Sequence, residues 1–499
     1  MQHPRAVSRT VHYLVGLLAL ACGSKSALLI GSAASDDGGA GAGGAGAGGA
    51  GAGGASAGGT SSGGGAGAPE AGVDAPPPLP DCLYVQHGEP IVIFTYGEGV
   101  HTPTLAPITT TAPARIAVGL IHEHFWHPEL RVAELTVGAA WPEGVSTTHG
   151  MLLYGIDAHA PGQLVPSTNG PGELALLYFH ADEASPNVTP GVMFRRFDTG
   201  AWKPFDEVFV EKLGGYAYSL AAGPSLGKGM GWANLGYGMT WRSATSGDAG
   251  SPLVATRVGV SDASGNVIAG PVDVAPASAY PGIGATIAWT GQSYVLASNA
   301  RPCAASSPDC ANRLTLARLE PGVGSAAKLV ETSVQPPAPG LRARTPLLRS
   351  FAGATWAVWR EQKIDAKPGE DVPSRLHLAS VNAVGQLGSD VWQADAHPDA
   401  GAELLVSDQG VLLLWGERLD TAVQPHQVGH SRLRLKQLSK TGGELQELDL
   451  PTTSLTSGTA YSVTTLAEPR ALLVAWTSQE PKPSGHAQAH LARFDCVPQ

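Results

Sequence analysis

The densest group of potential metal ligands is the stretch HEHFWH, from His122 to His127. Side chains two positions apart on a β-strand share a face, so His122 and His124 would point the same way. His127 could reach them if the chain reverses in a hairpin. Three histidines can hold zinc or copper. We therefore consider a metal site at His122, His124 and His127. No spacing here matches a known metal signature, and solvated surface histidines are the alternative.

A second stretch matches the sequence pattern of a nucleophile elbow. The residues 223–227 read GPSLG, which satisfies Gly-x-Ser-x-Gly. That motif requires a strand before it and a helix after it. The following residues, 228–231, read KGMG and will not start a helix. We interpret the segment as a loop and assign no catalytic residue to it.

Pairs of carboxylates are the third candidate for chemistry. They are Asp182 with Glu183, Glu370 with Asp371, and Asp395 with Asp399. Glycosidases hydrolyse their substrates with two carboxyl groups. Acidic residues in loops also serve solubility. The pairs therefore keep a propeller glycan hydrolase open as an alternative function.

The elements that must position these residues are β-strands. Between Cys82 and Cys496 no apolar period of 3.6 residues is sustained over about twelve residues. Apolar runs ending in an aromatic residue recur instead, at 174–178, 238–241, 355–359, 411–415 and 472–476, and 292–296 fits the same place without the aromatic. Strands that alternate apolar and polar residues follow about seventeen residues later. They lie at 313–316, 375–378, 432–435 and 490–494. This alternation predicts one packed face.

A repeat of about sixty residues with four strands is typical of a β-propeller blade. The stretch 402–450 shows one such unit clearly. About 420 residues hold about seven repeats. The sequence therefore predicts an all-β fold, a β-propeller of seven four-stranded blades, with six blades as an alternative. Extrapolation along the repeat places a strand of the first blade at 115–120.

The way the ring closes can also be predicted. The last recognisable strand ends near Cys496, and apolar strand formers at 83–85 and 91–96 precede the first blade. Because a propeller is stable only when its last blade meets its first, we expect the N-terminal segment to supply the outer strand of the last blade. A disulfide between Cys82 and Cys496 would then staple the closure.

The remaining cysteines are Cys22, Cys303 and Cys310. Cys303 and Cys310 lie in one loop and are expected to form a local disulfide. Paired cysteines imply an oxidising compartment.

Residues 1–22 have the form of a secretory signal peptide, with Arg5 and Arg9 before a short apolar run. The run is too short to span a membrane. Its end, LLALACG at 17–23, resembles the lipobox of bacterial lipoproteins, although Ala19 stands where leucine is usual. The resemblance implies lipidation of Cys22 and a membrane anchor, and Gly23 after it favours the outer membrane or cell surface. A soluble periplasmic or secreted protein is the alternative.

A low-complexity segment, 23–78, separates this signal from the rest of the chain. It is dominated by Gly and Ala and closes on three consecutive prolines, 76–78. Such a composition cannot support a core, so we expect a disordered tether. The folded domain is therefore predicted to be 79–499.

Charge and loop lengths bear on the partner. The net charge is −11 with 15% charged residues, which argues against nucleic acid. We expect no cofactor and a monomer.

If the strands of a blade are named A to D from the axis outward, the B–C loops are the long ones, and all emerge on one face. Long loops on a rigid scaffold commonly bind ligands. The sequence thus predicts a non-catalytic binding or scaffold module for an unknown protein or glycan.

Overall fold

The chain divides into two units, residues 1–75 and 76–499, and every residue described below belongs to the second. The computed structural model describes residues 82–96, 100–109, 113–124, 127–154, 163–166, 172–180, 191–212, 217–222, 236–245, 253–278, 284–299, 312–321, 326–364, 374–396, 402–418, 431–450, 461–467, 470–479 and 487–498. The predicted signal peptide, tether, Cys22, Cys303 and Cys310 lie outside these ranges. In the described ranges no helix is long and apolar enough to cross a membrane.

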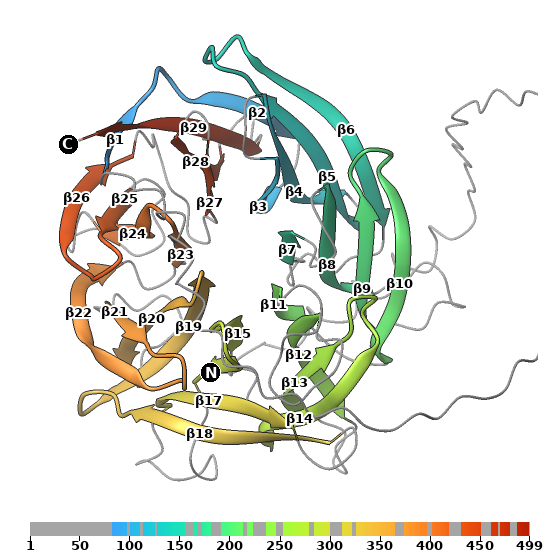
Figure 1. Ribbon diagram of the computed structural model, residues 1–499, viewed down its shortest axis with the longest axis vertical. Helices are drawn as coiled ribbons and strands as arrows, with labels where there is room; N and C mark the ends of the chain where they lie inside the picture. Colours follow the sequence, from blue (N-terminus) through green and yellow to red (C-terminus); the bar gives the residue numbers. More distant parts are fainter. Residues whose placement is uncertain are drawn as a thin grey trace, which may run out of the picture. The chain divides into compact units, whose positions relative to one another are not determined.

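Seven antiparallel sheets stand around a common centre, which confirms the predicted seven-bladed β-propeller (Figure 1). Blade 1 contains β3 (Val100–Thr109), β4 (Ala114–His124), β5 (His127–Val137) and β6 (Val145–Tyr154). Blade 2 contains β7 (Gln163–Pro166), β8 (Glu173–His180), β9 (Gly191–Asp198) and β10 (Lys203–Lys212). Blade 3 contains β11 (Ala217–Ala222), β12 (Tyr237–Thr245), β13 (Leu253–Ser261) and β14 (Val267–Ser278). Blade 4 contains β15 (Ala285–Trp289), β16 (Tyr294–Ser298), β17 (Leu314–Pro321) and β18 (Ala327–Gln335).

The last three blades complete the ring. Blade 5 contains β19 (Leu341–Phe351), β20 (Ala354–Lys363), β21 (Ser374–Val381) and β22 (Leu387–Ala396). Blade 6 contains β23 (Ala402–Ser407), β24 (Gly410–Arg418), β25 (Ser431–Leu438) and β26 (Glu444–Asp449). Blade 7 contains β27 (Tyr461–Leu466), β28 (Ala471–Gln479), β29 (Ala487–Pro498), β1 (Cys82–Gln86) and β2 (Ile91–Tyr96). The first strand of each blade is innermost, and each inner strand contacts the inner strand of the next blade, including β27 with β3.

The recurring aromatic position lies on strand B of its blade, as the spacing predicts. Tyr178, Trp241, Leu296, Trp359, Trp415 and Trp476 occupy it, and all are buried. The alternating strands are strand C, and the strand predicted at 115–120 is part of β4. One expectation was wrong, because both faces of strand C are packed. His377 and Lys436 on the polar face are only 7% and 5% exposed. Each blade lies between two others, so both faces of a middle strand are packed over most of its length, although Arg375 near the start of β21 is exposed.

Short C–D hairpins hold adjacent blades together. The turns at Gly265, Gly385 and Gly442 have φ of 91°, 85° and 89°, a conformation that favours glycine. A Cβ added at Gly265 would lie 2.0 Å from the ring of Phe194, in the preceding blade. Glycine is thus required there both by the backbone conformation and by close packing between blades.

Blade 7 is built from both ends of the described chain, as predicted. Both β1 and β2 pair with the outer edge of β29, so the N-terminal segment supplies the outer strand in two pieces. The Cys82–Cys496 disulfide joins these paired strands, with Cα atoms 5.2 Å apart. The predicted closure is therefore confirmed.

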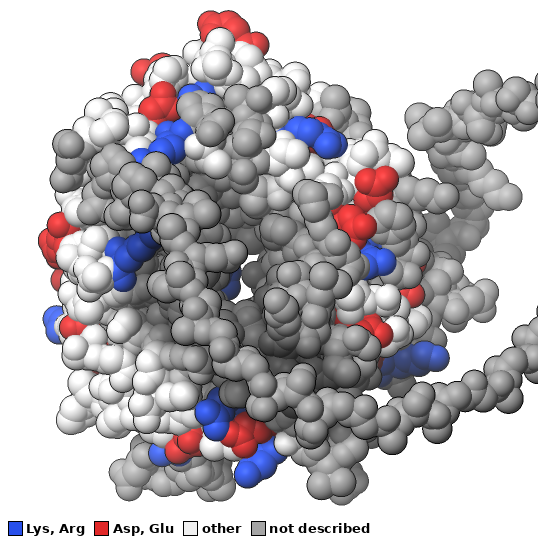
Figure 2. Space-filling model, viewed as in Figure 1, with Lys and Arg blue, Asp and Glu red and all other residues white. Residues whose placement is uncertain are grey.

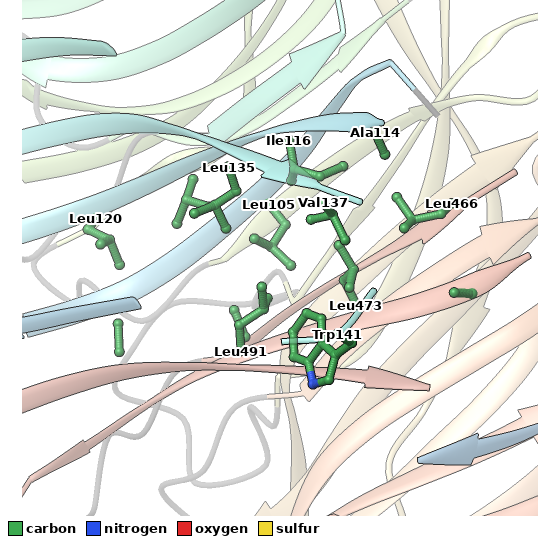
Figure 3. Close-up of a cluster of buried hydrophobic side chains, with 14 residues drawn as sticks. Leu105, Ala114, Ile116, Leu120, Leu135, Val137, Trp141, Leu466, Leu473 and Leu491 are labelled. Carbon is green, nitrogen blue, oxygen red and sulfur yellow. The ribbon is translucent and has the colours of Figure 1, made fainter. Parts of the chain in front are cut away.

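An apolar core lies between the last blade and the first. Figure 3 shows Leu105, Ile116 and Leu135 of blade 1 meeting Leu473 and Leu491 of blade 7. Backbone oxygens of Gly138 and Ala139 also accept hydrogen bonds from Arg493, at 3.1 and 3.2 Å. Closure therefore combines apolar burial with polar contacts.

Glutamine side chains of blade 6 hold β1 from its other side. Gln446 accepts a hydrogen bond from the Tyr84 amide at 2.7 Å and donates one to the Tyr84 carbonyl at 2.8 Å. Gln437 donates to the Cys82 carbonyl at 2.8 Å. These bonds fix β1 against the ring independently of the disulfide.

Candidate functional site: the B–C face and the axis

The long connections lie where the sequence predicts them. All seven B–C connections run through residues outside the described ranges, and six of them are long, at 181–190, 246–252, 300–311, 365–373, 419–430 and 480–486. The predicted loop carboxylates Asp182, Glu183, Glu370, Asp371 and Asp399 lie there or in other such segments. In blade 1, β4 and β5 are instead joined directly through 125–126. We call the face from which these connections emerge the B–C face.

One long connection lies on the opposite face. Residues 223–235 join strands A and B of blade 3. They include the Gly-x-Ser-x-Gly match at 223–227 and lie outside the described ranges. The remaining carboxylate, Asp395, is on β22 and lies 3.9 Å from Arg375 on β21. This is a cross-strand ion pair at the surface.

The histidine cluster forms the hairpin that the sequence allows. In the β4–β5 register His124 faces His127, and His122 faces Glu129. Residues directly opposed in an antiparallel pair share a face of the sheet, so Glu129, absent from the predicted set, joins the three histidine positions. Their side chains lie outside the described part, and the metal site stays a prediction. Among the described residues no group of three or more His, Cys, Asp or Glu could hold a metal ion.

A basic residue on strand C faces the tryptophan of strand B in four blades. The opposed pairs are Trp241 with Arg257, Trp359 with His377, Trp415 with Arg434, and Trp476 with His490. The Trp359 and His377 rings stack at 5.0 Å, and the Arg434 guanidinium lies 5.8 Å from the Trp415 ring centre. Sequence reasoning identified the tryptophans but missed their basic partners. A constant offset from strand B to strand C is the signal that could have found them.

The imidazole of His377 lies between two carboxylates. Asp390 Oδ2 lies 2.7 Å from Nδ1, and Glu361 Oε2 lies 3.5 Å from Nε2. Burial is the largest single influence on the pKa of His377 and lowers it, but the two carboxylates together outweigh burial. The pKa of His377 is therefore raised.

The matching position in blade 6 is the centre of a wider ion-pair network. Arg434 Nη1 lies 2.9 Å and Arg432 Nε 2.5 Å from Glu417 Oε2. Burial tends to raise the pKa of Glu417, but the two guanidinium groups together lower it. In blade 3, Glu211 of the preceding blade accepts from Arg257 at 2.7 Å and from the Trp241 indole. These groups connect strands and blades, which identifies them as part of the scaffold.

The charged residues near the axis are few and mostly basic. The seven inner strands hold one Asp or Glu, Glu403 on β23, and three arginines on β19, Arg342, Arg344 and Arg349. Arg349 Nη2 donates to Glu403 at 3.2 Å. Burial raises the pKa of Glu403 despite this arginine. Figure 2 shows positive and negative residues interspersed around the visible face, with no field of one sign over its described atoms.

Comparisons with known proteins give remote structural likenesses. No protein-family model and no curated protein matches the chain. An α-L-arabinofuranosidase from Fusarium graminearum is 13% identical with a TM-score of 0.38, over 65% of this chain and 90% of that one. The haemagglutinin-neuraminidase of parainfluenza virus 5 is 10% identical with a TM-score of 0.32, over 73% and 93%. A glucose dehydrogenase is 10% identical with a TM-score of 0.36, over 81% and 99%. At these values the likeness carries no argument about function.

Proposed function

We propose that this propeller is a non-catalytic binding module whose ligand contacts the B–C face. The observation that carries the proposal is the placement of the long connections. Six blades send a long B–C connection to one face. The A–B turns of blades 4, 5 and 6, on the other face, are short and span only 290–293, 352–353 and 408–409. Rigid blades that present many variable loops on one side form a typical binding surface.

The inner strands favour binding over hydrolysis. Glycoside hydrolysis generally uses two carboxyl groups about 5–10 Å apart. The described inner strands offer Glu403 alone, and Arg349 holds its carboxylate. A glycan hydrolase would need a second carboxylate from the loops and stays the alternative.

We further propose that the protein is exported and held at the cell envelope by lipid on Cys22. The disulfide at Cys82 supports an oxidising compartment. Substituting Cys22 by Ala should release the protein from membranes into the soluble fraction. Unchanged membrane association of Cys22→Ala would contradict the anchor.

The binding proposal is tested by shortening loops on each face. The full chain is used as bait against envelope extracts and a glycan panel. In one variant 365–373 and 419–430 are replaced by short Gly-Ser turns, and in the matched control 223–235 on the opposite face is shortened. We expect the first variant to lose the captured ligand and the control to retain it. Equal retention by both would refute the B–C face, and release of sugar from the panel would favour the hydrolase.

A further inference from the structure

An ion pair joins the innermost strands of blades 5 and 6. Arg349 Nη2 on β19 donates to Glu403 Oε1 on β23 at 3.2 Å, and the two strands are neighbours around the axis (Figure 1). The side chains of Arg349 and Glu403 are 25% and 22% exposed, so water reaches both. We call these two residues the axial pair.

Local backbone geometry places the axial pair on the side of these strands that faces the axis. Phe351 and Ser407 each close a two-residue hairpin turn, so both are hydrogen-bonded to strand B. Bonded and free positions alternate along an antiparallel pair, so three residues earlier the N–H and C=O of Leu348 and Leu404 point away from strand B. The guanidinium of the axial pair donates to the Leu348 carbonyl at 3.2 Å. Burial raises the pKa of its carboxyl group, and the Leu404 amide is among the groups that oppose the rise. Both side chains therefore lie at the free, axis-side edge of their strands.

Buried hydroxyl groups make the corresponding contacts at three other junctions between inner strands. Ser219, Thr286 and Ser462 each hydrogen-bond the backbone of the next inner strand, at 3.3, 3.3 and 3.0 Å. These three residues are at most 8% exposed. Joining two inner strands therefore does not require charged side chains, and the axial pair provides more than a structural contact needs.

The carboxylate of the axial pair is also not the form that stability favours. Burial raises the pKa of Glu403, although Arg349 opposes the rise. A group whose folded pKa is raised stabilises the fold below its unfolded pKa, and this contribution is lost as pH rises through the folded value. At neutral pH the ionised Glu403 is thus less favourable in the fold than in the unfolded chain. Groups of this kind concentrate at functional sites.

A second arginine–glutamate pair shows the structural alternative. In blade 1, Arg115 Nε and Nη2 donate to the two carboxylate oxygens of Glu134 at 2.5 and 2.7 Å, and the Glu134 side chain is 10% exposed. The hydrogen bonds from Arg115 lower the pKa of Glu134. In the axial pair one guanidinium nitrogen bonds one carboxylate oxygen, and the carboxylate is more open to water. Because a carboxylate has about four acceptor sites, the axial pair keeps hydrogen-bonding capacity for a ligand.

Adjacent charged donor and acceptor groups of balanced charge suit neutral hydroxyl groups. A hydroxyl both donates and accepts, so two adjacent hydroxyls of a sugar can bond a carboxylate and a guanidinium at once. Hydrogen bonds to ionised groups are roughly twice as strong as those between neutral groups. A charged ligand group would instead compete for one member of the pair and leave the other without its partner.

We infer that the axial pair binds two adjacent hydroxyl groups of a neutral sugar in the ligand of the B–C face. Glu403 accepts from one hydroxyl and Arg349 donates to the other. The inner strands run from the B–C face to the A–B turns, and Glu403 is the second residue of β23, at the end toward that face. The inference rests on the proposed binding function and narrows its ligand to a glycan.

The first test uses sugar probes on the full chain. Glucose, galactose, mannose and xylose, and neutral oligosaccharides built from them, are titrated by calorimetry, with glucuronate and glucosamine as charged references. We expect saturable binding of at least one neutral sugar. The form of that sugar lacking one of the two adjacent hydroxyls should bind about tenfold or more weakly. Binding of none of the neutral sugars, or of charged sugars alone, would overturn the inference.

The second test compares Glu403→Gln with Glu134→Gln, which removes the same charge from the structural pair. Glu403→Gln should weaken sugar binding about tenfold or more and leave the melting temperature without sugar equal or higher, because a buried charge is removed. Glu134→Gln should lower the melting temperature and bind the sugar as the wild type does. Equal sugar binding by both variants, or a fall in melting temperature for Glu403→Gln as large as that for Glu134→Gln, would show that the axial pair is structural.

The same variants separate this inference from the proposed function. If envelope capture depends on the B–C loops but not on Glu403, the binding function stands and the sugar site fails. If Glu403→Gln abolishes capture and the loop-shortened variant retains it, the axial site stands and the B–C loops are not the binding surface.

Discussion

Blades 5 and 7 build the same stack of tryptophan on histidine and give the two imidazoles opposite proton affinities. Trp359 and His377 lie 5.0 Å apart at an interplanar angle of 10°, and Trp476 and His490 lie 5.3 Å apart at 12°. The pKa of His377 is raised, and burial lowers the pKa of His490. The stack is therefore compatible with a pKa shift in either direction. What surrounds the ring decides, and in blade 5 that is Glu361 and Asp390.

The two blades also differ in where their outer strand comes from. In blade 5, β22 follows β21 along the chain through a hairpin, so local connection holds it. In blade 7, β1 comes from the N-terminal part of the described chain, 414 residues from its partner by the Cys82–Cys496 separation. In blade 7 the disulfide keeps the outer strand next to its neighbour, as the short hairpin between β21 and β22 does in blade 5.

Removing the disulfide should have the largest effect. In the chain-entropy model a loop of this size contributes about 6 kcal/mol to the free energy of unfolding, less any strain. The double variant Cys82→Ala, Cys496→Ala should lose stability on that scale in urea denaturation. Hydrogen exchange should accelerate in β1 and stay unchanged in β22.

Two controls sharpen this test. Cys82→Ala alone should equal the double variant, and so should the wild type under a reductant. Equal exchange in β1 before and after loss of the bond would mean that Gln437 and Gln446 suffice to close the ring.

The same two blades show which features the sequence could and could not predict. Trp359 and Trp476 were predictable because burial on strand B requires an apolar run, and the run recurs with the blade. The ring closure at Cys82 was predictable because the last blade lacks an outer strand after Cys496, and the N-terminal segment holds the strand formers that can supply it. The raised pKa of His377 was not predictable, since it depends on Glu361 and Asp390, which only the register brings together. The opposition of two arginines in blade 5 was missed for the same reason. Arg344 and Arg360 are unremarkable in sequence and become opposed only across the β19–β20 hairpin.

Replacing each histidine by leucine should separate the two stacks. His377→Leu leaves the carboxylate of Glu361, 7% exposed, without its imidazole partner. Leaving a buried acceptor without its partner in this way should cost about 1–3 kcal/mol. His490→Leu, the matched control, should cost about 1 kcal/mol or less, because an apolar side chain of similar size fills its place. Both are measured by urea denaturation at pH 7.

A second substitution checks the cause. Adding Glu361→Gln to His377→Leu should recover part of the loss, because no buried charge is then left. Equal losses for the two histidine variants would show that stacking on tryptophan, and not the ion pairs, sets the contribution of each ring.

The smallest effect is a pair of opposite slopes in stability against pH. For His377 the folded pKa lies above the unfolded value of about 6.5, so its contribution is complete below that pH and is lost as pH rises through the folded pKa. For His490 the folded pKa lies below the unfolded value, so stability is complete above about pH 6.5 and falls as pH decreases. His377→Leu should therefore remove a decline on the alkaline side and His490→Leu one on the acidic side, each of about 1 kcal/mol or less. The free energy of unfolding measured between about pH 5 and 9 resolves them. Slopes of the same sign for both histidines would mean that Glu361 and Asp390 do not hold the proton on His377, and the contrast between the blades would reduce to burial alone.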